Sequence, residues 1–287
     1  MKPIPVRHIT SAPKDPSPTG RFSIRTIEDL LNGSKLVHEL HKHDFFFVLA
    51  VQQGSGTHEI DFTQYNIQDH SIFILRPGQA HRLELAANST GFIVEFDNAF
   101  YQPRTPTHQQ RWLKASHKQF CAVTTPAFHQ LQSLLANMHL EFTTQPTGYL
   151  EAIQAYLDLF FLHYIRQSRN PGTIPRADNG YSQDRFEELQ QLLDAQITRL
   201  KSTSQYAELM RLSPYQLNAI TKSAVGKTVS ELINDQIILE AKRHLLATHH
   251  QVKEIADHLG YEDISYFIRF FKKHTGTSPD AFRKNFR

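Results

Sequence analysis

The sequence predicts a two-domain α+β protein: an N-terminal β-barrel with a helix pair, then an all-α domain with two helix-turn-helix units joined by a long helix. Residues 22–97 hold short β-branched and aromatic runs separated by turn residues, and residues 127–168 hold two segments with helical apolar spacing. Two similar helix-turn-helix patterns follow residue 183. A length of 287 residues also suits two domains.

Composition narrows the class of protein. No apolar run approaches the ~20 residues of a membrane helix, and the start MKPIPVRHIT lacks the apolar core of a signal peptide. The single cysteine, Cys121, excludes an intrachain disulfide framework and suits a reducing compartment. We therefore expect a cytoplasmic protein with no membrane association.

The positive charge is concentrated near the C-terminus. Residues 1–184 carry 16 Lys and Arg against 16 Asp and Glu, whereas residues 185–287 carry 15 against 12. From Ser265 onward there are six cations and one acid, Asp280. This asymmetry is modest, but it suits a surface that meets phosphates.

The first 20 residues contain five prolines and predict an N-terminal arm, either mobile or extended along the edge of a sheet. Residues 21–168 form the predicted barrel domain, whose strand-like runs are 22–27, 35–40, 45–52, 57–65, 71–77, 81–86 and 91–97. Residues 53–56 (QGSG) and 77–78 (PG) are predicted hairpin turns. Seven or eight short strands at this spacing indicate a small barrel or jelly roll.

The segments HELHKHD (38–44) and RPGQAH (76–81), with Gly54 between them, resemble the cupin domain. In metal-binding cupins the ligands are His-x-His, a glutamate a few residues later and a further histidine. His41, His43 and His81 match, but Phe47 stands about where the carboxylate would be. We therefore expect no metal and no cofactor, with the histidines lining a dry barrel, filling space or hydrogen-bonding an organic ligand.

Aromatic side chains on the same strands favour a small-molecule pocket. The effector-pocket candidates are His41, His43, Phe45, Phe47, Phe73 and His81. No nucleophile and base can be paired from the sequence, so we expect no catalytic residues and no enzyme activity.

Residues 127–142 and 148–168 predict a helix pair. The apolar stripe of the second helix looks too wide to be covered by the barrel alone, which predicts a homodimer through this pair. Packing within one chain is the alternative. Residues 169–182 (RNPGTIPRADNGYS) contain two prolines and two glycines and predict a linker.

The C-terminal domain, residues 183–287, is predicted to open with a helix at 186–197 and to hold helix-turn-helix units at 203–226 and 252–276. Thr203 and Ser204 are candidate caps of the next helix, and Ser213 with Pro214 forms a good helix start. Both units end at glycines suited to helix C-caps, Gly226 and Gly276.

The two units align as a repeat when they are counted back from these glycines. Leu217 and Ile220 then match Phe267 and Phe270 on the buried side. The exposed sides carry Tyr215, Asn218, Ala219 and Lys222 in the first unit, and Ser265, Tyr266, Arg269, Lys272 and Lys273 in the second. A long helix at 228–248 would hold them at the roughly 34 Å spacing of successive DNA major grooves.

Several ordered motifs make residues 183–287 similar to the AraC/XylS family of transcription regulators. They are SPYQL (213–217), GKT (226–228), ILEAKRHLL (238–246) and EIADHLGYEDISYFIRFFKKHTGTSPDAFR (254–283). The resemblance implies an N-terminal domain that senses a small molecule and forms a homodimer. It also implies binding of double-stranded operator DNA and activation through RNA polymerase.

By the same analogy, Tyr215, Asn218, Ala219, Ser265, Tyr266 and Arg269 would face bases, and Lys222, Lys272 and Lys273 would meet phosphates. Ala219 stands where many relatives have a longer polar residue, so the first unit would read shape or a thymine methyl.

We therefore expect a sequence-specific DNA-binding activator modulated by a small molecule in the barrel. The alternatives are a constitutive regulator, a cupin enzyme with iron on His41, His43 and His81 plus a DNA-targeting domain, and a scaffolding module.

Overall fold

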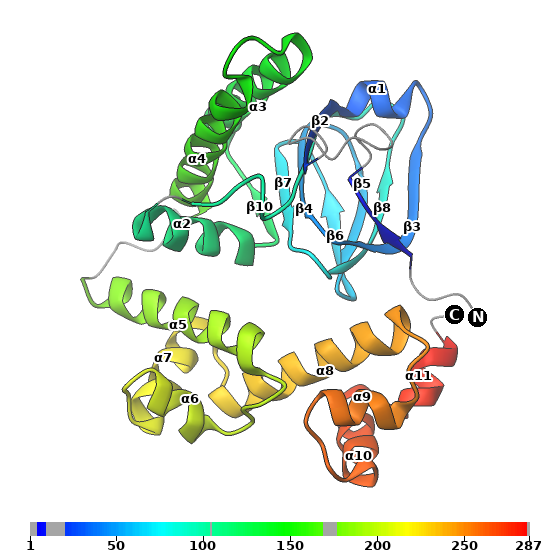
Figure 1. Ribbon diagram of the computed structural model, residues 1–287, viewed down its shortest axis with the longest axis vertical. Coiled ribbons are helices and arrows are strands. Elements are labelled where there is room, and N and C mark those ends of the chain that lie inside the picture. The colour runs from blue at the N-terminus through cyan, green and yellow to red at the C-terminus, as the bar shows by residue number, and fades with distance from the viewer. Residues whose placement is uncertain (1–4, 10–20, 104, 169–176, 286–287) are drawn as a thin grey trace. The chain divides into compact units, whose positions relative to one another are not determined.

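The computed structural model describes residues 5–9, 21–103, 105–168 and 177–285. The chain divides into two compact units, within Pro5–Gly172 and Thr173–Arg287, each drawn in Figure 1. Among the described helices, none combines the length and the apolar character needed to cross a membrane. Each unit is built around its own buried core.

The N-terminal unit is a pair of five-stranded sheets. The first has the order β1 (Val6–Arg7), β3 (Leu36–His43), β8 (Ala80–Leu85), β5 (Gly56–Ile60), β6 (Thr63–Ile67). The second has the order β10 (Phe120–Ala122), β7 (Ser71–Leu75), β4 (Phe46–Gln53), β9 (Thr90–Phe96), β2 (Phe22–Thr26). Neighbouring strands are antiparallel except β1 and β3. This double sheet confirms the predicted small barrel or jelly roll.

Strand β4 is buried on both faces, which explains its unbroken apolar run. Phe47, Leu49 and Val51 belong to the cluster between the sheets. Their neighbours Phe46, Val48 and Ala50 belong to a second cluster, formed with three helices: α2 (Pro106–His117), α3 (Thr125–Thr144) and α4 (Tyr149–Ser168). Successive side chains of a strand point to opposite faces, so one strand supplies two cores.

The prediction that residues 53–56 and 77–78 form hairpin turns is wrong. Residues 53–56 join β4 to β5, and residues 77–78 join β7 to β8; in each case the two strands belong to different sheets. A hairpin instead joins β5 and β6 through Asp61 and Phe62, whose φ angles of 49° and 68° lie in the left-handed region. Local turn signals mark where a strand ends but carry no information about the sheet that the next strand joins.

The apolar stripe of α4 is mostly buried within the N-terminal unit. Ile153, Leu157, Phe160, Phe161 and Tyr164 are each at most 1% exposed and pack in the cluster on the outer face of the second sheet. Helix α2, which contributes the single Trp112, completes this layer. These five residues therefore do not require a second copy of the chain, but Leu159 beside them is 43% exposed, and the homodimer stays a prediction.

The C-terminal unit is entirely helical. Its helices are α5 (Ala177–Gln196), α6 (Thr203–Leu209), α7 (Pro214–Val225), α8 (Val229–Ala247), α9 (Val252–His258), α10 (Ile264–Thr275) and α11 (Pro279–Asn285). Because α5 begins at Ala177, residues 177–182 of the predicted linker are helical, and residues 169–176 lie outside the described residues. Helix α1 (Ile27–Leu31) of the other unit, strand β10 and helix α11 were not predicted.

Helix ends follow the capping signals closely. Ser213 caps α7 with Pro214 in the first turn, and Gly226 and Gly276 end α7 and α10 in the left-handed conformation. The cap of α6 is Ser202 rather than Thr203 or Ser204; it forms a reciprocal capping box with Gln205. The predicted positions were wrong by one and two residues, because neighbouring hydroxyl residues give the same local signal.

The two helix-turn-helix units repeat the same turn. Leu212 N donates to Ala207 O at 2.9 Å, and Tyr261 N donates to Ala256 O at the same distance. The residue that reverses the chain has a positive φ in both turns, 55° at Arg211 and 73° at Gly260. The predicted repeat is therefore confirmed in the backbone.

A shared core fixes the two helix-turn-helix units relative to one another. Tyr261 and Phe270 of the second unit pack against the cluster formed by α5, α6, α7 and α8. A Cβ atom on Gly260 would lie only 2.4 Å from the carbonyl oxygen of Thr198. Lys201 Nζ donates to that oxygen at 3.1 Å and lies 5.2 Å from the ring centre of Tyr261. The second turn is thus seated on the segment between α5 and α6.

Gly260→Ala should destabilise the C-terminal unit by at least ~2 kcal/mol, because the new methyl group strains the positive φ and meets the Thr198 carbonyl. Arg211→Ala is the matched control, since Arg211 already tolerates a positive φ and is exposed. Urea unfolding followed by helical circular dichroism should show the loss. Fluorescence of Trp112, which lies in the N-terminal unit, should keep its midpoint; equal midpoints for Gly260→Ala and Arg211→Ala would contradict the close approach.

Candidate functional site

The exposed face of α7 carries three of the four side chains predicted for the first unit. Tyr215 is 84% exposed, and Ala219 and Lys222 are also exposed. The opposite face places Leu217 and Ile220 in the buried interior. The 3.6-residue period of the helix separates these two faces, so one face is free to meet another molecule.

Asn218 is used within the domain. Its Nδ2 donates to the carbonyl oxygen of Pro214 at 2.9 Å, and its Oδ1 accepts from Val229 N at 3.0 Å. Val229 is the first residue of α8, so the amide ties α7 to the start of the long helix. Both polar atoms of the side chain are therefore engaged within the domain, and each keeps one further hydrogen-bonding position, because the NH2 group has a second hydrogen and the oxygen a second lone pair.

Helix α10 presents all five side chains predicted for the second unit. Ser265, Tyr266, Arg269, Lys272 and Lys273 are exposed, while Phe267 and Phe271 are fully buried. Asp263 holds the start of the helix by accepting from Ser265 N and Tyr266 N at 2.7 and 3.2 Å. The ring of Tyr266 stacks on Tyr261 with a centroid distance of 6.0 Å, which limits the directions this side chain can take.

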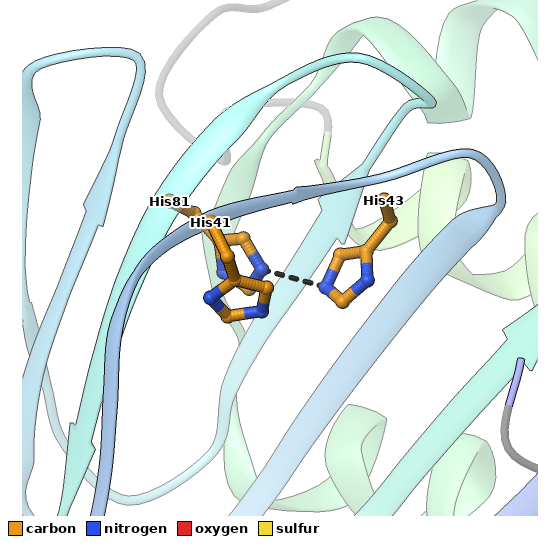
Figure 2. A group of neighbouring side chains, drawn as sticks. All are labelled: His41, His43 and His81. Carbon is orange, nitrogen blue, oxygen red and sulfur yellow. Dashed lines mark hydrogen bonds between the residues drawn. The ribbon is translucent and has the colours of Figure 1, made fainter. Parts of the chain in front are cut away.

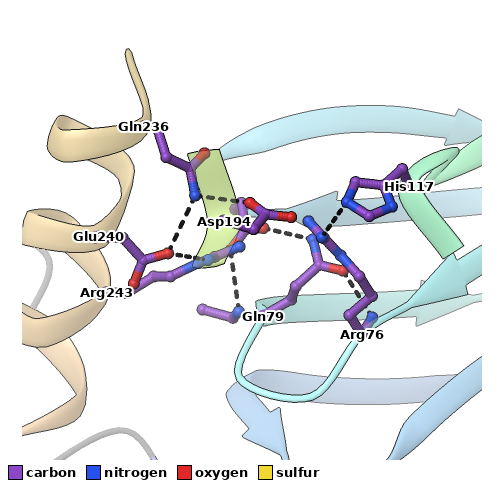
Figure 3. A network of polar contacts seen from close by, with 9 residues as sticks. Arg76, Gln79, His117, Asp194, Gln236, Glu240 and Arg243 are labelled. Atoms are coloured by element: carbon purple, nitrogen blue, oxygen red, sulfur yellow. Dashed lines mark hydrogen bonds and ion pairs between the residues drawn. The ribbon is translucent and has the colours of Figure 1, made fainter. Parts of the chain in front are cut away.

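The cations on the two exposed faces differ from other cations of the unit. Lys227 pairs with Asp235, and Arg243 pairs with Glu240 on α8 (Figure 3). In contrast, Lys222, Arg269, Lys272 and Lys273 have no ion-pair partner among the described residues. Unpaired cations on one helix face generate a positive potential that favours polyanions.

Three histidines converge inside the barrel (Figure 2). His41 and His43 lie on β3, His81 lies opposite His41 on β8, and all three are at most 5% exposed. The Nε2 atoms of His43 and His81 are 2.7 Å apart, and His81 Nδ1 lies 2.9 Å from Nε2 of His58 on β5. His58 is fully buried and was not singled out from the sequence, although alternation along β5 places it beside Ile60 on the inward face.

Burial keeps these imidazoles neutral. Loss of hydration lowers the pKa of His41 to about 4, of His58 to about 3 and of His43 to about 2. It also lowers the pKa of His81 well below its usual value, and the neighbouring histidines add to the effect. Neutral rings have a lone pair on one nitrogen and a proton on the other, so each can accept as well as donate.

The predicted aromatic pocket residues meet the histidines. The rings of Phe45 and Phe47 lie 4.3 and 5.3 Å from that of His43, and Phe47 is nearly parallel to it. Phe73 contacts His58 with a centroid distance of 4.7 Å. The structure thus brings all six predicted pocket residues into one group.

An ion pair between a buried glutamate and a partly exposed arginine was not predicted. Glu95 on β9 is paired with Phe47 in the sheet and is 5% exposed; its carboxylate accepts from Arg25 Nη2 at 3.1 Å. Burial raises the pKa of Glu95, and the nearby Arg25 opposes that shift. Alternation with Ile93 would have placed Glu95 inward, but nothing in the sequence pairs it with Arg25.

At the edge of the barrel, Arg76 donates to His117 at 2.9 Å (Figure 3).

Asn218→Ala should destabilise the C-terminal unit by roughly 1–3 kcal/mol, because it removes two hydrogen bonds and leaves Val229 N without its partner. Ser223→Ala, at an exposed position of the same helix, is the control and should change the unfolding free energy little. The measurement is urea unfolding by helical circular dichroism. If both variants unfold at the wild-type midpoint, Asn218 does not have this structural role.

Two family models match the chain and together cover both units. Residues 32–155 match the AraC-like ligand binding domain, and residues 206–285 match a helix-turn-helix domain. A transcriptional activator named RhaS from Pectobacterium carotovorum is 26% identical over 85% of this chain and 86% of its own. A transcriptional activator named RhaR from Yersinia pseudotuberculosis is 20% identical over 86% of this chain and 84% of its own.

Among solved structures, ToxT from Vibrio cholerae with a bound unsaturated fatty acid matches with a TM-score of 0.41 and 17% identity, over 92% of this chain and 95% of that one. One family model matches each unit, in the order expected from the sequence motifs. The two relatives are transcriptional activators, and the match to this chain covers most of the length of each. The chain belongs to the AraC family of transcriptional regulators.

Proposed function

We propose that this regulator is an activator that reads a specific operator by inserting α7 and α10 into successive major grooves of double-stranded DNA. The observation that carries the proposal is the pair of exposed helix faces with unpaired cations, mounted on one shared core. Because that core fixes their separation, the two helices would bind as one body rather than independently.

The exposed residues divide by chemistry into base-reading and phosphate-binding groups. Arg269 has the fork of donors that matches a guanine edge, while Tyr215, Ala219, Ser265 and Tyr266 suit shape, methyl or single hydrogen-bond contacts. Lys222, Lys272 and Lys273 suit phosphates, which they would bind as point charges. Asn218 would contribute indirectly by holding α7 against α8.

A small-molecule effector in the N-terminal barrel would regulate this binding. The support is the inward-facing group of His41, His43, His81 and the three phenylalanines, which combines apolar walls with a few polar groups. An effector shifts activity only if it binds two conformations unequally. A regulatory role of this kind requires no catalytic residue, and none is proposed.

The remaining partners follow from the role of an activator. RNA polymerase would be contacted at the promoter, in the cytoplasm. A homodimer through α3 and α4 would place two DNA-binding units on two half-sites. Leu140 of α3 and Leu159 of α4 support this, because they are 59% and 43% exposed although the rest of the helix pair buries its apolar stripe.

Arg269→Ala should reduce discrimination between the operator and a sequence with one changed guanine by roughly 1–3 kcal/mol. Lys273→Ala is the matched control on the same helix: it should weaken binding to all sequences alike and lower the slope of log affinity against log salt by about one. Competition gel shifts at several salt concentrations measure both effects. Unchanged specificity in Arg269→Ala would contradict the base-reading assignment.

Leu159→Glu should shift the chain from dimer to monomer, since a charge would be buried in the proposed interface. Val37→Glu is the control, because Val37 on β3 is 41% exposed and lies outside the helix pair. Sedimentation equilibrium gives the mass directly. A wild-type monomer at micromolar concentration, or a Leu159→Glu dimer, would rule out this interface.

A further inference from the structure

The convergent histidines of the barrel interior have separations close to those of a metal site. One ring nitrogen from each of His41, His43 and His81 lies within 4.8 Å of the other two, and the closest pair is 2.7 Å apart. Tetrahedral coordination with bonds of about 2.1 Å places ligand nitrogens roughly 3.4 Å apart. The observed range includes that spacing, so modest rotations of the rings would bring all three nitrogens to one ion.

His41 already has the hydrogen bond of a ligating imidazole. Its Nδ1 lies 2.7 Å from the carbonyl oxygen of Glu39, which can only accept, so Nδ1 carries the proton. The lone pair is therefore on Nε2, a buried atom with no hydrogen-bond partner among the described residues. A buried acceptor left unused costs free energy, and a bound cation would satisfy it.

His58 can fix the tautomer of His81 in the same way, through a hydrogen bond to its second ring nitrogen. If His81 Nδ1 donates to His58 Nε2, the lone pair of His81 lies on Nε2, toward His43. Ligating histidines commonly have the second ring nitrogen held in this way, which fixes both tautomer and ring orientation. His43 is held by the parallel ring of Phe47. Without a metal its Nε2 would carry the proton and donate to His81 Nε2, so binding an ion requires that proton to move to Nδ1, which has no partner among the described residues.

We propose that His41, His43 and His81 bind a divalent transition-metal ion in the sensing domain, with His58 as a positioning residue that orients His81. The ligands are three neutral imidazoles, a set that suits Zn²⁺, Cu²⁺, Fe²⁺ or Ni²⁺ rather than Mg²⁺ or Ca²⁺. Three protein ligands leave a fourth position open for water or for an oxygen donor of an effector.

This assignment differs from the expectation from sequence, which excluded a metal because Phe47 occupies the carboxylate position. The structure changes that reasoning in two ways. His58, absent from the motif, supports a ligand, and Phe47 stacks on His43 instead of leaving a gap. The site is independent of the proposed DNA contacts, so it can fail or succeed without them.

The first test uses the full wild-type chain, freed of metal with a chelator and titrated with Zn²⁺ by calorimetry. We expect about one ion per chain at neutral pH; under ~0.1 per chain would overturn the site. Co²⁺ in place of Zn²⁺ should give the intense visible bands of a four-coordinate ion. X-ray absorption of the Zn²⁺-loaded chain should show a shell of three imidazoles, and a mainly oxygen shell would also overturn the site.

Variants then test which histidines act. His41→Ala and His43→Ala should each weaken Zn²⁺ binding at least ~100-fold, whereas His58→Phe should keep one ion per chain and weaken binding by about 10–100-fold. The control is His249→Ala with His250→Ala, an exposed pair outside the barrel. Trp112 fluorescence reports whether each variant keeps the N-terminal fold. Binding that survives His41→Ala and His43→Ala, or is lost in the control, would contradict the proposal.

Discussion

The contact between the Gly260 turn and the segment that joins α5 to α6 is the constraint on which the DNA-binding unit depends. Thr198 O leaves no space for a side chain at position 260, and Lys201 closes the contact over Tyr261. Tyr261 and Phe270 extend the first unit's core into the second. Two short helical units, each too small to be stable alone, thereby become one rigid body. A fixed separation of α7 and α10 follows from that packing.

In the N-terminal unit, strand β4 has a comparable role, because its side chains belong to two cores. Its alternate side chains fill the space between the sheets and the layer beneath α2, α3 and α4. Because both layers share one strand, a change in the interior can reach the helices without passing through a flexible segment. The histidines lie on this interior, so whatever binds them is well placed to alter the packing of the helix pair.

Side chains on a recognition face need not all serve recognition. Asn218 lies on α7 between exposed positions, yet its amide is committed to Pro214 and Val229. The hydrogen bond from Val229 N stabilises the junction with α8, and the two bonds together fix the orientation of the amide. His58 in the barrel shows the opposite case. No sequence motif singles it out, yet it contacts the ring of His81 and can hold it in place.

Periodicity and capping, which are local, determined most of the architecture: the strand runs, the helix pair, both helix-turn-helix units and the caps at Ser213, Gly226 and Gly276. They also determined which residues of α10 are exposed, because a helix separates its faces by spacing alone. Three features were decided only by the tertiary structure. They are the sheet that each strand joins after a turn, the burial of the α4 stripe within the chain, and the pairing of Glu95 with Arg25. These features depend on contacts between residues far apart in sequence, and no local pattern encodes which distant partner a side chain will meet.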